Sequence, residues 1–349
     1  MPNREILIDE TQIKNACQRI GQEINFSAAI DTGTIPRRIF KSYLAEGITV
    51  EQTPREVVCP ENIKFLKNSE YINNFFANRG FEIIKPLYII NKNQYKTTDF
   101  IGAGIFMIEN EIHSPGARNK SLKFVSQPSF RTQHIGSTTI GFSPAFVNLA
   151  SIGIGLDFDQ HCTVIKHWED FLVSLGMSRS NINYQENWVK KQWGKTGMTG
   201  HEVYFYYQGF PLGDASFNTV TDGANAGFSF SDTGFGLERI KWLLQGGEYQ
   251  QTFSGSNSLY KDISYPDICR LHALTLLIGE DVRPGANGNR AKVRKLSKEY
   301  VGNNPGQDTT GNIISDFYNN WSMWTNLLVN KPEVVGIILQ ENQNNVEKK

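Results

Sequence analysis

The segment 231–240, with the sequence SDTGFGLERI, combines two glycines with an acidic and a basic side chain. Gly234 and Gly236 would let a ligand approach the backbone closely, because glycine has no Cβ atom. Arg239 could hold a phosphate through two parallel hydrogen bonds of its guanidinium. Phosphate binding is therefore one interpretation of this segment. The other is an ordinary junction between a strand and a helix, with Arg239 in solvent.

A second segment, 124–131 with the sequence FVSQPSFR, also ends in an arginine. Its pattern predicts a strand, followed by a turn from Gly136 to Gly141 and a second strand from 142 to 150. We therefore predict a hairpin with Arg131 at the end of its first strand. Taken alone, a surface arginine at a strand end is the simpler interpretation of this position.

The elements that must position these residues can be predicted from apolar periodicity. Strands are predicted at 122–130, 142–149 and 202–207, and a helix at about 161–175. The segment 226–245 changes from strand to helix periodicity midway, and the chain from about 266 onward has helical periodicity. We therefore predict an α+β fold with a helical C-terminal region. The predicted domains are a mostly helical N-terminal extension at 1–60, a catalytic domain at 61–250 and a helical domain at 251–349.

The composition argues against several classes of protein. The 349 residues include 35 basic and 35 acidic side chains, and this balance argues against a globally basic nucleic-acid binder. The four cysteines are not paired at metal-binding spacing, which fits a reducing compartment. No apolar run approaches the length of a bilayer span. We expect a cytoplasmic protein with neither DNA nor a membrane as a partner.

The two arginine-bearing segments together resemble motifs 2 and 3 of class II aminoacyl-tRNA synthetases, and are closest to alanyl-tRNA synthetases. The segment 232–240 nearly repeats the aspartate–threonine–glycine and glycine–leucine–glutamate–arginine signature of that family. Ser126, Gln127 and Arg131 match its motif 2. Further resemblance follows in the same order along the chain, over roughly 70–300, at 71–84, 101–106, 194–206 and 276–296.

The resemblance implies a six-stranded antiparallel sheet flanked by helices, and it implies ATP as a substrate. Arg131 would hold the α-phosphate of ATP and the attacking carboxylate, and Arg239 would hold the γ-phosphate. Phe146 would stack on adenine. Gly234 and Gly236 would border the nucleotide.

The same resemblance suggests how the other ligands would bind. Asp232 would bind the ammonium group of the substrate amino acid. Mg²⁺ would bridge phosphate oxygens, with Glu202 as the candidate ligand. A homodimer through the motif 1 region, at about 70–90, is a further expectation.

Two features depart from the family. The motif 2 loop from Thr132 to Gly141 is short, and Val147 replaces the glutamate expected beside Phe146. The resemblance stops soon after the first helices of the tRNA-recognition region, so we expect a truncated, stand-alone relative. The predicted activity is ATP-dependent activation of a small amino acid, alanine first, with transfer to tRNA or another acceptor. The alternative is a non-catalytic paralogue that binds an amino acid or tRNA for regulation.

The segment 283–298 has an excess of basic residues. Arg290, Arg294 and Lys298 recur every four residues and would share one face of a helix. This face could contact an RNA backbone, or it could be an ordinary solvated helix surface. The sequence leaves both interpretations open.

Overall fold

The structure is a computed structural model that describes residues 59–113, 119–135, 141–207, 210–253, 263–300 and 307–346. Nearly all of the predicted extension at 1–60 lies outside the described residues. The same holds for most of the predicted turn between Gly136 and Gly141. The boundaries predicted at 60 and 250 stay predictions.

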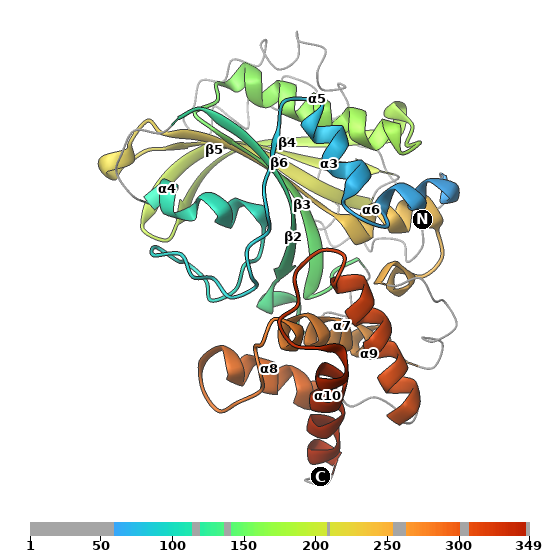
Figure 1. Cartoon of the computed structure of the whole chain (residues 1–349). Helices are drawn as coiled ribbons and strands as arrows, with labels where there is room; N and C mark the ends of the chain where they lie inside the picture. The colour runs from blue at the N-terminus through green and yellow to red at the C-terminus, as the bar shows by residue number, and fades with distance from the viewer. Residues whose placement is uncertain are drawn as a thin grey trace, which may run out of the picture.

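A seven-stranded sheet forms the centre of the molecule, with the strand order β1-β2-β3-β7-β6-β5-β4 (Figure 1). Strands β2 to β7 pair antiparallel with their neighbours, whereas β1 pairs parallel with β2 at the edge. The α+β prediction is confirmed, and a two-residue parallel strand is added to the six expected strands. The strands are β1 (Glu82–Ile83), β2 (Ser121–Phe130), β3 (Ala145–Ile154), β4 (Ile182–Trp193), β5 (Thr196–Tyr207), β6 (Phe210–Val220) and β7 (Ser229–Gly236).

Helix α5 (Phe158–Ser174) covers one face of the sheet, as the periodicity at 161–175 predicts. It begins with a capping box, in which Asp157 accepts a hydrogen bond from the Gln160 amide and the Gln160 side chain accepts one from the Asp157 amide. Trp168 is fully buried and stacks on Phe235 of β7, with ring centres 4.5 Å apart. Helices α3 (Glu70–Ala77) and α6 (Leu237–Gln245) pack within the same apolar core.

The opposite face of the sheet is only partly covered. A 3₁₀ helix, η3 (Gly104–Ile108), runs into α4 (Glu109–His113) and packs on Val125, Ile152 and Phe230. Buried Glu109 accepts hydrogen bonds from Asn91, Asn93 and Thr97, and so ties the preceding loop to α4. Over another part of this face, the described residues of β3, β6 and β7 line a cavity.

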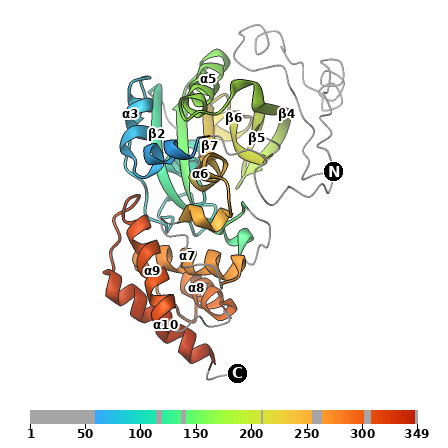
Figure 2. The same cartoon turned by 90° about the vertical axis from the view of Figure 1, so that its right-hand side faces the viewer.

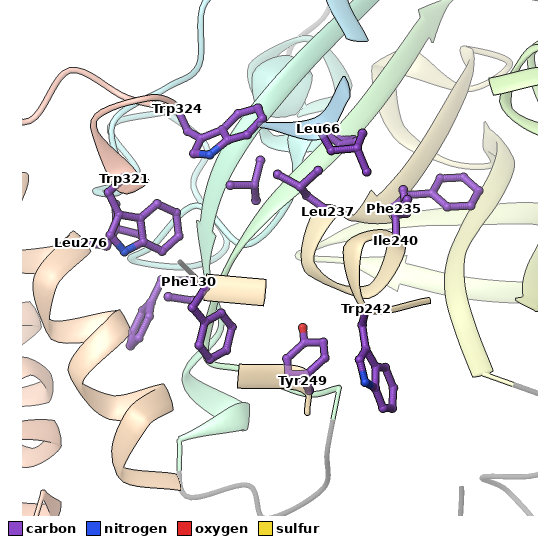
Figure 3. Packing of buried hydrophobic residues seen from close by; sticks show 14 of the residues in the cluster. Leu66, Phe130, Phe235, Leu237, Ile240, Trp242, Tyr249, Leu276, Trp321 and Trp324 are labelled. Atoms are coloured by element: carbon purple, nitrogen blue, oxygen red, sulfur yellow. The ribbon is translucent and has the colours of Figure 1, made fainter. Parts of the chain in front are cut away.

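A helical region lies beyond the ends of β2 and β3 (Figures 1 and 2). Its described helices are α7 (Tyr265–Gly279), α8 (Gly288–Glu299), α9 (Gln307–Trp321) and α10 (Lys331–Val346). Trp321, Trp324 and Leu276 from this region belong to the same buried cluster as Phe130 and Tyr249 (Figure 3). Among the described helices, none is long and apolar enough to cross a membrane. Two short 3₁₀ helices, η2 (Pro60–Leu66) and η7 (Tyr249–Phe253), pack against α6.

Candidate active site

Arg131 follows β2 directly, where the strand ends beside the open face of the sheet. Its Nε donates a hydrogen bond of 2.9 Å to the Gly102 carbonyl, and its guanidinium lies 4.9 Å from the centre of the Phe146 ring. Burial lowers the pKa of Arg131, while the Asp214 carboxylate opposes that effect. Among the described residues, only Nε of this guanidinium has a hydrogen-bond acceptor, so its two terminal nitrogens could bind a ligand.

Arg239 lies in the first turn of α6, as predicted, directly after the glycine-containing end of β7. Its Nε donates a hydrogen bond of 2.9 Å to the Gly141 carbonyl, and the guanidinium lies 4.6 Å from the Phe142 ring centre. The two arginines are therefore held in the same way, each by a backbone carbonyl and an aromatic ring. This arrangement fixes two cations before any anion binds.

One cavity brings together all six residues that the sequence assigns to ATP and the amino acid. Its other walls include His134, Ser143, Asn148, Asp214 and Tyr249. The sequence-predicted residues in its lining are Arg131, Phe146, Asp232, Gly234, Gly236 and Arg239. Residues more than 100 positions apart thus share one site, which is the arrangement that the motif assignment requires.

The glycines of β7 allow close packing of neighbouring side chains as well as close approach of a ligand to the backbone. A Cβ atom at Gly234 would lie 2.9 Å from Nδ2 of Asn148, which is too close for a real contact. Asn148 in turn accepts a hydrogen bond of 2.8 Å from the Gly104 amide, so it links β3 to η3. A Cβ atom at Gly236 would meet only the Arg239 side chain, at 3.6 Å. A larger residue at position 234 would therefore clash with Asn148, whereas the space beside Gly236 is less restricted.

Two carboxylates face the cavity from adjacent strands. Asp232 on β7 has its pKa raised to about 7 by burial, with a further contribution from Asp214. The Asp214 carboxyl on β6 is open to the cavity yet surrounded by protein atoms, and this desolvation raises its pKa despite nearby Arg131. Among the described residues, none donates a hydrogen bond to either carboxylate. Sequence reasoning missed Asp214; its only signal is a carboxylate within an otherwise alternating apolar strand.

Glu202, the predicted Mg²⁺ ligand, does not line this cavity. One of its oxygens lies 2.8 Å from Lys191 Nζ, and the other accepts a hydrogen bond of 2.8 Å from the Tyr204 hydroxyl. Both oxygens thus have protein partners, whereas those of Asp214 have none in the described chain. The described residues contain no group of three or more side chains able to hold a metal ion.

Glu238 positions the residue that follows Phe146. Both of its carboxylate oxygens accept from the Val147 amide, at 3.1 and 3.2 Å. Burial raises the pKa of Glu238 to about 7, with Lys241 opposing. Val147 stands where the family has a glutamate. In this protein another glutamate, Glu238 of motif 3, contacts β3 at that position.

The sequence is similar to those of known alanine–tRNA ligases, in line with the resemblance of motifs 2 and 3. No model of a known protein family matches the chain. An alanine–tRNA ligase of Methanosphaera stadtmanae is 27% identical over 204 residues, which cover 54% of this chain and 22% of the relative. That of Methanothermobacter thermautotrophicus is 26% identical over 185 residues, which cover 49% of this chain and 20% of the relative. This chain is related to alanyl-tRNA synthetases.

A third alanine–tRNA ligase, from Thermoplasma acidophilum, is 23% identical over 231 residues, or 60% of this chain and 24% of the relative. The chain thus spans a quarter or less of the length of these curated relatives. The fold agrees with the relationship, because its six antiparallel strands and flanking helices are the class II synthetase arrangement expected from the motifs.

The predicted RNA-contacting residues lie on α8, away from the cavity lining. Arg290 and Lys298 are exposed, and Arg294 is half-buried. The terminal nitrogen of Arg290 approaches the Pro284 carbonyl at 3.4 Å. Another residue of this helix, Lys292, reaches the segment before η3, where its Nζ lies 2.8 Å from the Asp99 carboxylate. RNA contact through α8 stays a prediction.

Proposed function

We propose that this protein uses ATP to activate the carboxylate of a small amino acid as an aminoacyl-adenylate, with alanine as the first candidate. The observation that supports the proposal most is a single cavity holding Arg131, Arg239 and Asp232. Adenylation requires that two anions meet, and fixed cations reduce their repulsion. The relationship to alanine–tRNA ligases supports the same chemistry.

The geometry suggests a role for each arginine. Arg131, held by Gly102, would contact the α-phosphate and the attacking carboxylate, since it shares the cavity with Phe146, the proposed adenine contact, and with Asp232, the proposed ammonium contact. Arg239 would hold the γ-phosphate at the start of α6, where the helix N-terminus also favours negative charge. The carboxylate would attack the α-phosphorus in line, and pyrophosphate would leave. No covalent protein intermediate is needed, so positioning contributes much of the rate.

The acidic residues have two distinct proposed roles. Asp232 would bind the α-ammonium of the amino acid, which would supply the partner that its carboxylate lacks. Asp214 fits Mg²⁺ better than Glu202 does, because its oxygens line the cavity and have no partner among the described residues, whereas both oxygens of Glu202 are paired. When bound, Mg²⁺ would neutralise phosphate charge.

Amino-acid-dependent exchange of pyrophosphate into ATP tests this proposal directly. We expect purified protein with ATP and Mg²⁺ to give exchange that one small amino acid stimulates, with alanine tested first. Omission of the amino acid is the control. ATP binding without exchange for any standard amino acid would instead support a regulatory paralogue that binds without catalysis.

A further inference from the structure

A second cavity, of about 450 Å³, lies beside the candidate active site and shares Arg131 and Ala103 with it. Its remaining walls come from the segment 96–102, from the two residues after Arg131 and from Lys292 of α8. The helical region therefore completes a site that begins in the catalytic body. Three buried aromatic residues also line this cavity: Phe100, Phe106 and Phe130.

Charged side chains in the walls of this cavity carry an excess of positive charge. Lys292 Nζ lies 2.8 Å from Asp99 and 5.3 Å from the centre of the Phe100 ring. Lys96 Nζ lies 3.6 Å from the same carboxylate. The hydrogen bond from Lys292 is the largest cause of the lowered pKa of Asp99. Lys96 and Lys292 outnumber the single carboxylate of Asp99, and this excess of positive charge favours an anionic ligand.

We propose that the second cavity binds the molecule that accepts the aminoacyl group, and that this acceptor is a small anionic compound with a nucleophilic amine or hydroxyl. This inference rests on the adenylation function proposed above. The two cavities meet at Arg131, the residue assigned to the reacting carboxylate. A nucleophile in the second cavity would therefore lie next to the carbonyl carbon of an adenylate held by Arg131.

The transfer step needs only the adenylate and the acceptor. The acceptor nitrogen or oxygen forms a bond to the carbonyl carbon, and the bond between that carbon and the phosphate oxygen breaks. AMP leaves with the electron pair, and the proton of the nucleophile passes to solvent or to a phosphate oxygen of AMP. Phe100, Phe106 and Phe130 would give the acceptor apolar walls beside the charged groups.

The position of Lys292 favours a small acceptor over RNA. Its ammonium group contacts Asp99 within a concave site, whereas exposed Arg290 and Lys298 do not line that site. RNA backbones are held mainly by cations that reach phosphates along a surface. A cavity with aromatic walls and a few placed charged groups is typical of small-molecule binding.

Matched amine nucleophiles test the predicted charge preference. The adenylate is formed with the amino acid that supports exchange, and is challenged with ethanolamine, O-phosphoethanolamine or β-alanine. The readouts are AMP release and the acylated amine, measured by mass spectrometry and divided by the exchange rate of the same preparation. We expect the phosphate- or carboxylate-bearing amine to react at a lower concentration than ethanolamine does.

Removing a positive charge from the second cavity should weaken the preference for anionic amines, and removing a negative charge should strengthen it. Lys292→Glu should raise the KM of the preferred anionic amine by about threefold to tenfold, since half-exposed charge pairs contribute modestly. Asp99→Asn removes the competing carboxylate and should lower the same KM. Lys295→Glu is the matched control, because Lys295 lies on α8, is exposed and does not line the cavity. It should leave the KM unchanged.

The outcomes separate this inference from the proposed function. Absence of exchange in the wild type refutes adenylation. The anion site is then tested by calorimetric titration with O-phosphoethanolamine and β-alanine. Binding that Lys292→Glu weakens supports the site, and the absence of such binding refutes it. Exchange without any preference for an anionic amine, or equal effects of Lys292→Glu and Lys295→Glu, overturns the inference. Total tRNA that accelerates AMP release, with loss of that effect in Lys292→Glu, also overturns it and identifies RNA as the acceptor.

Discussion

The two faces of the central sheet are built from the same strands yet have opposite properties. On the α5 side, Leu149 and Phe235 pair across β3 and β7 and are fully buried under Trp168. On the other side, alternate residues of the same strands, Asn148 and Asp232, line the cavity. Because successive side chains of a strand point to opposite faces, one stretch of sequence contributes both to the apolar core and to the cavity lining.

The faces also differ in how their polar groups are satisfied. Under α5, the Trp168 indole donates to Ser151 Oγ at 2.7 Å, and His161 Nδ1 lies 2.8 Å from Ser231 Oγ. On the cavity side, the carboxylate of Asp232 has no partner among the described residues. An unpaired carboxylate in a desolvated site lowers stability, and such groups cluster at functional sites.

The largest expected effect on stability comes from Trp168→Ala. Removal of this buried ring leaves a cavity against Phe235 and an unpaired Ser151 hydroxyl, and should lower the free energy of unfolding by about 3–5 kcal/mol. Urea denaturation measures this loss, and Met323→Ala, at an exposed position, is the control. The KM values of the remaining folded protein should be unchanged. A large change in the KM for ATP would contradict the division between the two faces.

Arg131→Ala should give the complementary result. Loss of one fixed cation at the reacting phosphate should reduce the exchange rate by roughly 10²–10³, or about 3–4 kcal/mol. The melting temperature should change little, because Arg131 follows the end of its strand. Arg79→Ala is a matched control, since Arg79 packs on Phe75 away from the cavity. An exchange rate equal to that of the wild type would refute the motif 2 assignment.

Asp232→Asn should weaken amino-acid binding while ATP binding persists. Loss of a charge-assisted hydrogen bond predicts a rise in the amino-acid KM of about 10–100-fold. In the wild type this KM should rise as the pH falls through about 7, because protonation removes the carboxylate charge, and the variant should lack that dependence. Equal loss of ATP and amino-acid binding would indicate a structural role instead.

The same substitution should affect stability with a defined sign. The pKa of Asp232 is raised to about 7 from its usual 3.8, so its ionisation destabilises the folded state fully above pH 7. Asp232→Asn should therefore raise the melting temperature at pH 8. The increment should shrink as the pH falls from 7 toward 4, since the folded protein binds the proton first. A constant increment across this range would contradict the assigned cause.

The smallest effect is expected on α8, which belongs to neither face of the sheet. Alanine at Arg290, Arg294 and Lys298 together should change product formation less than about twofold. If these residues do contact duplex RNA, the slope of log K against log salt should instead flatten by roughly 2–3 units. A tight, salt-sensitive tRNA complex that the triple substitution abolishes would favour a tRNA ligase.

Much of the fold could be predicted, but the short strand β1 and the two long strands β4 and β6 could not. Strand β2 and helix α5 follow from apolar periodicity within their own segments. Strand β4 was missed because it is a polar edge strand, in which Lys190 and Lys191 interrupt any apolar face. Strand β6 was missed because Pro211 and Gly213 disfavour regular strand structure, although neighbouring strands on both sides stabilise it here.

The sequence by itself determined the two arginine-bearing segments, because the spacing of glycine, arginine and apolar residues within about ten positions specifies a local turn and its side chains. Tertiary structure alone decided that Asp214 and Asp232 line one cavity from the adjacent strands β6 and β7, and that Lys292 meets Asp99 from 193 residues away. Such contacts depend on how the strands pair and on how the helical region packs against the sheet. Neither arrangement is encoded in the periodicity of a single segment.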